Sequence, residues 1–197
     1  MRIAFLRHGP TDWNATGRFQ GHTDIPLSTV GLAKMAALRL PPDFVPARIF
    51  VSPLARARQT AQALGLPPGT PDARLMEQNW GQWEGLTRAQ ILERHGDDAF
   101  ARFGLGAAFR PEGGESTGEL NTRLAAFLTD IAQEQSNAVA VAHLGVLRAA
   151  YTLATGWDMA TPMPAGLDVS KILLLSLAPD GSAKIAALNV DFSSRTD

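Results

Sequence analysis

Short apolar runs alternate along the whole chain with segments of helical periodicity, and this alternation limits the fold more than any other feature of the sequence. The runs are predicted to form strands at residues 2–7, 47–51, 138–142, 171–177 and 183–190. Strands that alternate with helices are typical of layered α/β proteins with a largely parallel sheet. No internal repeat, low-complexity tract or linker divides the chain, so we predict that residues 1–197 form a single α/β domain.

Helix start and stop signals lie between the strand-like runs. Helices are predicted at 29–39 after the cap Ser28, at 53–64 after the cap Ser52, from near Thr87 to His95, from the capping box of Ser116 and Glu119 onward, and at 144–155. The helix that begins at Ser116 is the clearest, because apolar residues follow its capping box at helical spacing.

Charge and composition exclude several classes of function. The formal net charge is −1 and no long block of one sign occurs, so nothing indicates a nucleic-acid-binding face or a polybasic membrane surface. The chain contains no cysteine, which excludes disulfides, thiolate catalysis and thiolate metal sites. The apolar run before Arg7 is too short for a signal peptide or a membrane span, and we expect a cytoplasmic protein that acts on small molecules.

Polar residues follow three of the predicted strands. His8 follows the first, Ser52 to Arg56 follow the second, and His143 follows the strand at 138–142. The carboxyl ends of parallel strands converge on one crevice, where ligands bind. Two of these loops also open helices, whose N-termini favour an anion, and Arg7 and Arg56 add planar cations suited to phosphate oxygens. The pattern therefore predicts a phosphate site.

An imidazole in this site has the properties of a nucleophile. A histidine attacks phosphorus only when it is neutral and one ring nitrogen carries a free lone pair. Flanking arginines lower the pKa of His8 and so favour its neutral form, while the same charges attract the phosphate. A nearby carboxyl group is also required, because the leaving alcohol oxygen must receive a proton.

Five sequence blocks resemble one known family. They are Leu6-Arg7-His8-Gly9-Pro10-Thr11-Asp12-Trp13-Asn14, residues 18–28, residues 52–57, residues 75–85 with Leu75-Met76-Glu77 and Gly81-Gln82-Trp83-Glu84-Gly85, and residues 143–148. In their order and spacing they resemble the histidine phosphatase superfamily, the phosphoglycerate mutase-like proteins. The resemblance is to the phosphatase branch, with α-ribazole phosphatase and broad-specificity phosphatases, and covers residues 1 to about 150.

The resemblance implies a fold and a set of roles. It implies a three-layer α/β/α sandwich with a mostly parallel sheet, no metal and no cofactor. His8 is implied as the nucleophile and Glu77 as the proton donor, and the implied ligands of the phosphoryl group or substrate are Arg7, Asn14, Gln20, Gly21, Arg56 and His143. The expected partner is a small phosphorylated metabolite. The oligomeric state is left open, with a homodimer among the alternatives.

Some residues have a competing interpretation. Glu84 lies seven residues from Glu77 and is the alternative proton donor. Leu144 stands where many members of the family have glycine, which could shift the phosphate pocket. Arg94-His95-Gly96 repeats the tripeptide around His8, but it ends a helical pattern and is interpreted as a helix C-terminus. His22 is expected to be a pocket-rim or exposed residue and not a metal ligand, since the four histidines lack the short spacing of a zinc site.

Three functions remain open at this point: a phosphatase, a cofactor-dependent phosphoglycerate mutase, and a catalytically idle member that binds a phosphorylated ligand. The segment between Glu77 and His143 is expected to cover the crevice, and it carries Trp80, Trp83, Phe100, Phe103 and Phe109. It spans only 66 positions, whereas the mutases of the family carry an additional insertion there. A thin cover admits water to a phosphoenzyme, so we favour the phosphatase.

Overall fold

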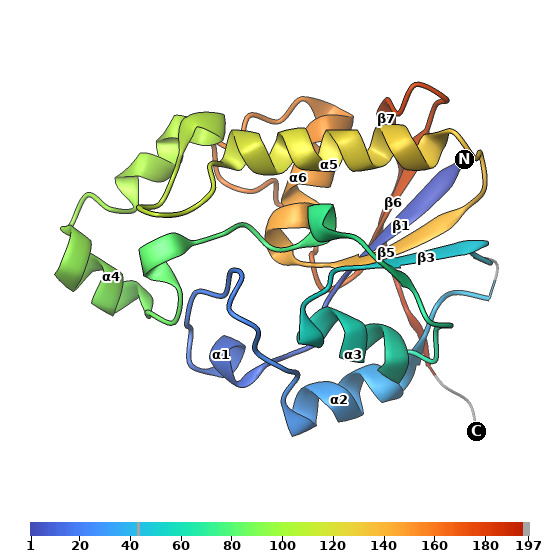
Figure 1. The fold of residues 1–197 in the computed structure, drawn as a ribbon, viewed down its shortest axis with the longest axis horizontal. Helices are drawn as coiled ribbons and strands as arrows, with labels where there is room; N and C mark the ends of the chain where they lie inside the picture. The colour runs from blue at the N-terminus through green and yellow to red at the C-terminus, as the bar shows by residue number, and fades with distance from the viewer. Residues whose placement is uncertain (43, 195–197) are drawn as a thin grey trace.

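A six-stranded sheet forms the middle of the molecule in the computed structural model, which describes residues 1–42 and 44–194 (Figure 1). In spatial order its strands are β4 Thr70–Pro71, β3 Arg48–Val51, β5 Ala138–Ala142, β1 Arg2–Arg7, β6 Ile172–Leu177 and β7 Ala183–Val190. The pairs β4·β3, β3·β5 and β5·β1 are parallel, and β1·β6 and β6·β7 are antiparallel. The predicted α/β class with a mostly parallel sheet is confirmed.

Helices cover both faces of this sheet. α2 (Thr29–Ala36) and α3 (Ala55–Ala63) lie on one face, and α5 (Thr117–Ala132) and α6 (Leu144–Thr155) lie on the other (Figure 1). Since side chains alternate along a strand, β1 contributes Ala4 and Leu6 to the core under α2 and α3, and Ile3 and Phe5 to the core under α5 and α6. The result is the three-layer sandwich that the family resemblance implies.

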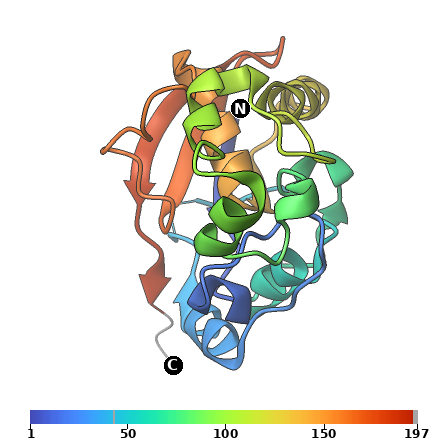
Figure 2. The same cartoon turned by 90° about the vertical axis from the view of Figure 1, so that its left-hand side faces the viewer.

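A third, smaller core lies beyond the carboxyl ends of β1 and β5. It is built from the short helices η2 (Gly81–Trp83), α4 (Arg88–His95) and η3 (Ala101–Ala108), which stand in front of the sheet in Figure 2. Its buried residues are Trp83, Leu86, Ile91, Ala99 and Phe109, and Phe19, Trp80 and Phe100 pack against them. Most aromatic residues of this segment therefore stabilise the cover itself; the side chain of Phe103 lies outside the described part.

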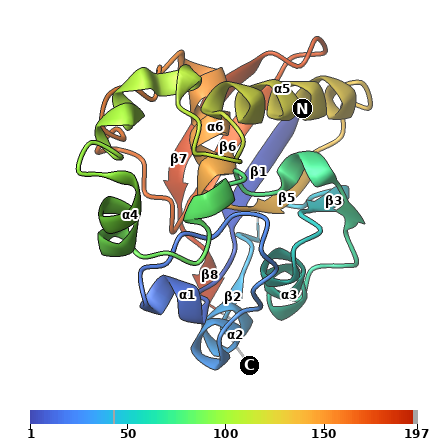
Figure 3. The same cartoon turned by 60° about the vertical axis from the view of Figure 1, so that its left-hand side comes forward.

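Two predicted helix boundaries are wrong. α2 ends at Ala36, because Leu38–Arg39 forms the strand β2 and pairs with β8 (Ser193–Ser194) near the other end of the chain (Figure 3). α3 begins at Ala55, with Leu54 as an N-cap that makes no side-chain hydrogen bond. Both differences come from partners distant in sequence, which override the local signals.

The other helix ends follow their caps. Ser116 and Glu119 form the predicted capping box of α5, and Thr87 and Gln90 form another at the start of α4. Gly96 follows α4 with a φ of 89°, so Arg94-His95-Gly96 is the helix end that the sequence indicates. α1 (Asp12–Ala15) and η1 (Ala73–Leu75) complete the set of helices. Over residues 1–42 and 44–194, no helix combines the length and apolar character needed to cross a membrane.

Candidate active site

The ends of three neighbouring parallel strands bring the predicted site together. His8 follows β1 and donates its backbone N–H to the carbonyl of Ala142 at 2.9 Å, and Ser52 follows β3 and donates to the carbonyl of Val141 at 3.0 Å. His143 follows β5 and is the N-cap of α6. The ring centroids of His8 and His143 are 5.1 Å apart. Sequence positions that lie 135 residues apart therefore share one crevice.

The geometry of His8 determines which ring nitrogen is free. Nδ1 lies 2.7 Å from the carbonyl oxygen of Gly9, which can only accept, so Nδ1 carries the hydrogen. Burial and the charges of Arg56 and Arg7 lower the pKa of His8 to about 3, so the ring is neutral at neutral pH. The lone pair is consequently on Nε2, as a nucleophile requires.

Two arginines flank this imidazole in different ways. Arg56 is fully buried and donates to the carbonyls of Gly21 (2.7 Å) and Thr23 (3.1 Å), which fixes its guanidinium against the loop after α1. Arg7 is half-buried, and its side chain makes no hydrogen bond or ion pair with any described residue. The Nε–H groups of both arginines are buried without an acceptor in the described part of the chain. Buried cationic donors of this kind are suited to an anionic ligand.

His143 is oriented by a residue whose role the sequence did not reveal. Its Nε2 lies 2.8 Å from the Ser52 hydroxyl, which also receives the backbone N–H of Leu54 at 3.4 Å. A hydroxyl that accepts from Leu54 can donate to Nε2, which leaves the ring proton on Nδ1. That Nδ1 is buried with no partner among the described residues. Ser52 thus positions His143 instead of capping a helix, because α3 starts three residues later.

Glu77 is buried beside the arginines. Its Oε1 accepts the backbone N–H of Gln78 at 2.8 Å and that of Gly145 at 3.0 Å. Burial raises the pKa of Glu77, although these two hydrogen bonds and the charges of Arg56 and Arg7 act in the opposite direction. Oε2 lies 3.2 Å from the same Gly145 N–H, so it only shares that donor with Oε1, and it is the oxygen that better accommodates a proton.

Two side chains hold the backbone of Glu77, and the sequence did not predict this positioning role for either of them. Its carbonyl accepts from Nη2 of Arg123 and from Nε2 of His22, each at 3.0 Å. Arg123 is itself fixed by an ion pair with Glu115, whose N···O distance is 2.6 Å. His22 is exposed and lines neither cavity near His8, and its Nε2–H donates to the carbonyl of Glu77.

The alternative carboxylate, Glu84, has a different environment. It accepts the backbone N–H groups of His22 at 2.8 Å and Thr23 at 2.7 Å, and the Thr23 hydroxyl. These hydrogen bonds outweigh partial burial and lower the pKa of Glu84. A carboxylate that is kept ionised by several donors is suited to holding the loop around Gly21 and not to donating a proton.

The remaining predicted ligands fall into two groups. The Thr11 hydroxyl lies 3.0 Å from the amide oxygens of both Asn14 and Gln20 and can donate its one hydrogen to either, which holds the two side chains near His8. Gly21 contributes its carbonyl to Arg56 and lines neither cavity near His8. A side chain at Gly21 would also collide with Glu84, since an added Cβ would lie 1.9 Å from Oε1. Gly21 therefore positions Arg56 in this structure.

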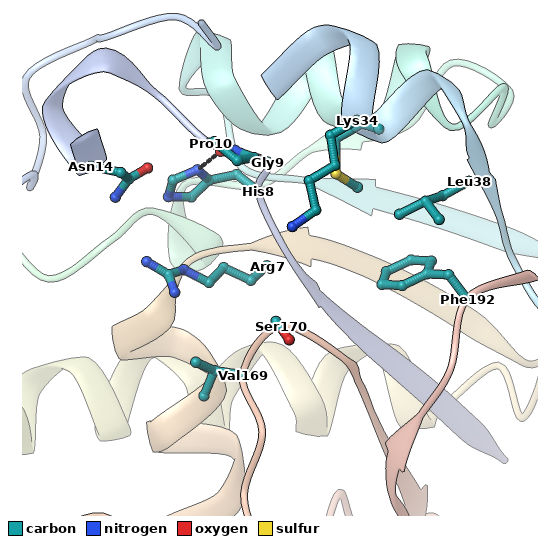
Figure 4. A pocket seen from close by; sticks show the side chains of 11 residues that line it. Arg7, His8, Gly9, Pro10, Asn14, Lys34, Leu38, Val169, Ser170 and Phe192 are labelled. Carbon is teal, nitrogen blue, oxygen red and sulfur yellow. Dashed lines mark hydrogen bonds between the residues drawn. The ribbon is translucent and has the colours of Figure 1, made fainter. Parts of the chain in front are cut away.

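Two cavities meet at Arg7, His8 and Asn14. The Glu77 chamber, of about 280 Å³, is also lined by Gln20, Glu77, Trp80, Leu144 and Arg148. The Lys34 chamber, of about 340 Å³, is also lined by Lys34, Leu38, Val169, Ser170 and Phe192 (Figure 4). Arg56 and His143 are fully buried and contribute to neither wall.

Arg148 and Leu144 form part of the wall of the Glu77 chamber. Arg148 closes the last sequence block, and its guanidinium lies over the ring of Trp157 at 5.3 Å while its Nε–H has no acceptor in the described part. Leu144 is half-buried in the chamber wall, and the next amide, of Gly145, binds Glu77. Across residues 1–42 and 44–194, no three His, Asp or Glu side chains are arranged to hold a metal ion.

Comparison with known proteins agrees with this geometry. Residues 3–191 match the family described as the histidine phosphatase superfamily (branch 1). A glucosyl-3-phosphoglycerate phosphatase of Mycolicibacterium vanbaalenii is 33% identical over 161 residues, which cover 75% of this chain and 71% of the relative. A 2,3-bisphosphoglycerate-dependent phosphoglycerate mutase of Gloeobacter violaceus is 33% identical over 121 residues, which cover 58% of this chain and 55% of the mutase.

A solved structure shares the whole fold. The mycobacterial glucosyl-3-phosphoglycerate phosphatase in complex with VO3 superimposes with a TM-score of 0.81 at 28% sequence identity, covering 96% of this chain and 99% of that one. The similarity thus extends through β6 and β7, beyond the last sequence block at residue 148.

Proposed function

The chain belongs to the histidine phosphatase superfamily (branch 1), and from this premise we propose that it hydrolyses phosphate monoesters through a phosphohistidine on Nε2 of His8. The observation that carries the proposal is the Nδ1–H···O=C bond from His8 to Gly9, because it leaves the Nε2 lone pair free in a neutral ring. The free donors of Arg7 and of the buried Arg56 and His143 lie around that ring and support binding of the phosphoryl oxygens.

In the first step Nε2 of His8 attacks phosphorus, and the bond between phosphorus and the leaving oxygen breaks. Glu77 supplies the proton from Oε2 to that oxygen, which leaves as a neutral alcohol. Support comes from the raised pKa of Glu77 and from its place in the wall of the chamber that His8 also lines. Loss of that proton leaves Glu77 as a carboxylate stabilised by Arg56 and Arg7.

In the second step water attacks the phosphorus of the phosphohistidine, and the N–P bond breaks. The Glu77 carboxylate takes a proton from the attacking water, which restores the acid for the next cycle. Inorganic phosphate leaves and Nε2 regains its lone pair. Arginine side chains supply the positive charge throughout, so the proposal includes no metal and no cofactor.

The test is replacement of His8 by Ala. Turnover of a nitrophenyl phosphate should fall to the background rate, and rapid acid-free quenching of the wild type with ³²P-labelled substrate should trap label on His8. His95→Ala is the matched control, because His95 stands in the same tripeptide but ends α4. The mechanism is refuted if His8→Ala retains near-normal turnover or if label accumulates on another residue.

Phosphoryl transfer between two positions of phosphoglycerate is the second candidate, because a mutase is among the relatives. A mutase must keep water away from its phosphoenzyme. Here the cover is the small core around Trp83, and the Glu77 chamber remains a cavity of about 280 Å³ beside His8. Room for water next to the phosphohistidine favours hydrolysis.

A further inference from the structure

Glu77 differs from the two histidines of the site in what holds its backbone. His8 and His143 each follow directly on a strand of the central sheet, whereas residues 76–80, between η1 and η2, form neither helix nor strand. Backbone groups in such a segment must find their partners elsewhere in the fold. The position of the proposed proton donor is therefore set by hydrogen bonds from other parts of the chain.

Arg123 on α5 binds this part of the chain at two carbonyl groups. Its Nη1 donates to the carbonyl of Arg74 at 2.5 Å, and its Nη2 donates to that of Glu77 at 3.0 Å. Nε and Nη2 also donate to the two carboxylate oxygens of Glu115, at 2.6 Å and 2.9 Å. A planar guanidinium makes all of these contacts at once, which the single ammonium of a lysine cannot do.

Glu115 holds the same segment through its own backbone. Its N–H donates to the carbonyl of Asn79 at 2.9 Å, and its carbonyl accepts from Nε2 of Gln78 at 2.9 Å. The Glu115 carboxylate also accepts the backbone N–H of Asn79 at 3.3 Å. The side chains of Arg123 and Glu115 are only 19% and 15% exposed, so neither charge is well hydrated without the other. The ion pair and the segment that carries Glu77 therefore form one connected unit.

Neither member of this pair reaches the substrate. Arg123 and Glu115 line neither the Glu77 chamber nor the Lys34 chamber. What they fix is the backbone from which the side chain of Glu77 extends to the wall of its chamber. A displacement of about 1 Å at a reacting group can cost about 100-fold in rate, although the displaced group keeps its chemistry.

We propose that Arg123, held by its ion pair with Glu115, is a positioning residue for the general acid and thereby determines which leaving groups the enzyme can expel. The inference rests on the proposed hydrolysis at His8 with Glu77 as the acid. An alkyl leaving group needs the proton of Glu77 in place, whereas a nitrophenolate leaves with little protonation. Loss of Arg123 should therefore restrict the enzyme to activated esters.

The test compares kcat for an alkyl phosphate and for nitrophenyl phosphate in Arg123→Met. The alkyl rate should fall about tenfold or more and the nitrophenyl rate less than about threefold, with KM nearly unchanged because Arg123 lines neither chamber. In the Glu77→Gln background the same replacement should cause little further loss on the alkyl substrate, since the proton is already missing. Arg123→Lys keeps the charge without the planar fork and should recover only part of the alkyl rate.

Arg110→Met is the matched control. Arg110 also pairs with a glutamate of α5, Glu119, at 2.7 Å, but both side chains are half-exposed. In the described part of the chain its hydrogen bonds go to Glu119 and to the carbonyl of Gly114, and none reaches residues 74–79. Arg110→Met should therefore leave both rates unchanged.

Glu115→Gln is a second variant for the case that Arg123→Met does not fold. It keeps the shape of the side chain, weakens the hold on Arg123 and should lower the alkyl rate selectively. Equal losses on both substrates in the folded variants, full recovery in Arg123→Lys, or an undiminished loss in the Glu77→Gln background would overturn the inference and leave the proposed function intact. Absence of hydrolysis of any monoester by the wild type, nitrophenyl phosphate included, would instead overturn the proposed function.

Discussion

Replacing Glu77 by Gln separates proton donation from binding. The amide has nearly the same shape, and its oxygen can occupy the place of Oε1 and keep the hydrogen bonds from Gln78 (2.8 Å) and Gly145 (3.0 Å). What disappears is the proton that Oε2 supplies. General acids contribute about 10²–10⁴-fold to such steps, so kcat on an alkyl phosphate should fall about 100-fold or more, equivalent to about 2.7 kcal/mol.

The size of the loss should depend on the leaving group. A nitrophenolate leaves with little protonation, so the loss on nitrophenyl phosphate should stay below about tenfold. The assay measures kcat for both substrates from pH 5 to pH 9 by phosphate release. In the wild type the rate on the alkyl substrate should fall at high pH as Glu77 loses its proton, and Glu77→Gln should lack that fall.

The same substitution should not destabilise the fold. Because burial raises the pKa of Glu77, the native state keeps a proton that the unfolded chain releases above pH 4.5, and stability declines as pH rises from there through the native pKa. Gln removes this penalty, so Tm at pH 7.5 should be equal or higher. Glu84→Gln is the control, since its carboxylate holds Thr23 and has a lowered pKa. Equal losses on both substrates, or a leaving-group effect in Glu84→Gln alone, would refute the assignment of Glu77.

Further outcomes follow from the charges of the site. The native pKa of His8 is about 3, so below pH 6.5 the unfolded chain binds a proton that the native ring does not. His8 alone should therefore lower the free energy of unfolding by about 2 kcal/mol between pH 7.5 and pH 5. Urea titrations at both pH values should show this loss in the wild type and not in His8→Gln. EDTA should leave activity unchanged while vanadate inhibits, and restoration by a divalent ion after EDTA would contradict the proposed electrostatics. Phosphate release from the best monoester should exceed interconversion of 2- and 3-phosphoglycerate, as a coupled assay with both substrates can measure.

Local signals predicted most of the fold. The buried strand Ala138–Ala142 and the helix after Ser116 were found at the residues where the structure has them, because each carries its own apolar period and cap. The failures occur where a distant segment intervenes. Leu38–Arg39 was predicted as helix but forms a strand, because it pairs with Ser193–Ser194. Local sequence signals carry no information about a partner so distant in the chain.

In the candidate site, too, local sequence predicted some features and only tertiary contacts decided the others. The sequence placed His8 and His143 at strand ends and put arginines beside them, and a parallel sheet then brings such ends together. The family resemblance favoured Glu77 over Glu84 as the proton donor, but no local physical signal separates two glutamates in one short segment. Burial of one and hydrogen bonding of the other distinguish them, and both effects depend on residues such as Gly145 and Thr23 that fold into contact.

The amino-acid sequence by itself therefore determined the order of strands and helices, the class of fold and the residues available for phosphoryl chemistry, since these follow from periodicity, caps and strand ends. The tertiary structure alone decided the state of those residues: which nitrogen of His8 is free, that Ser52 orients His143, and that Arg123 holds the backbone of Glu77. Protonation and direction are set by burial and by hydrogen bonds between residues distant in sequence, and such contacts exist only in the folded chain.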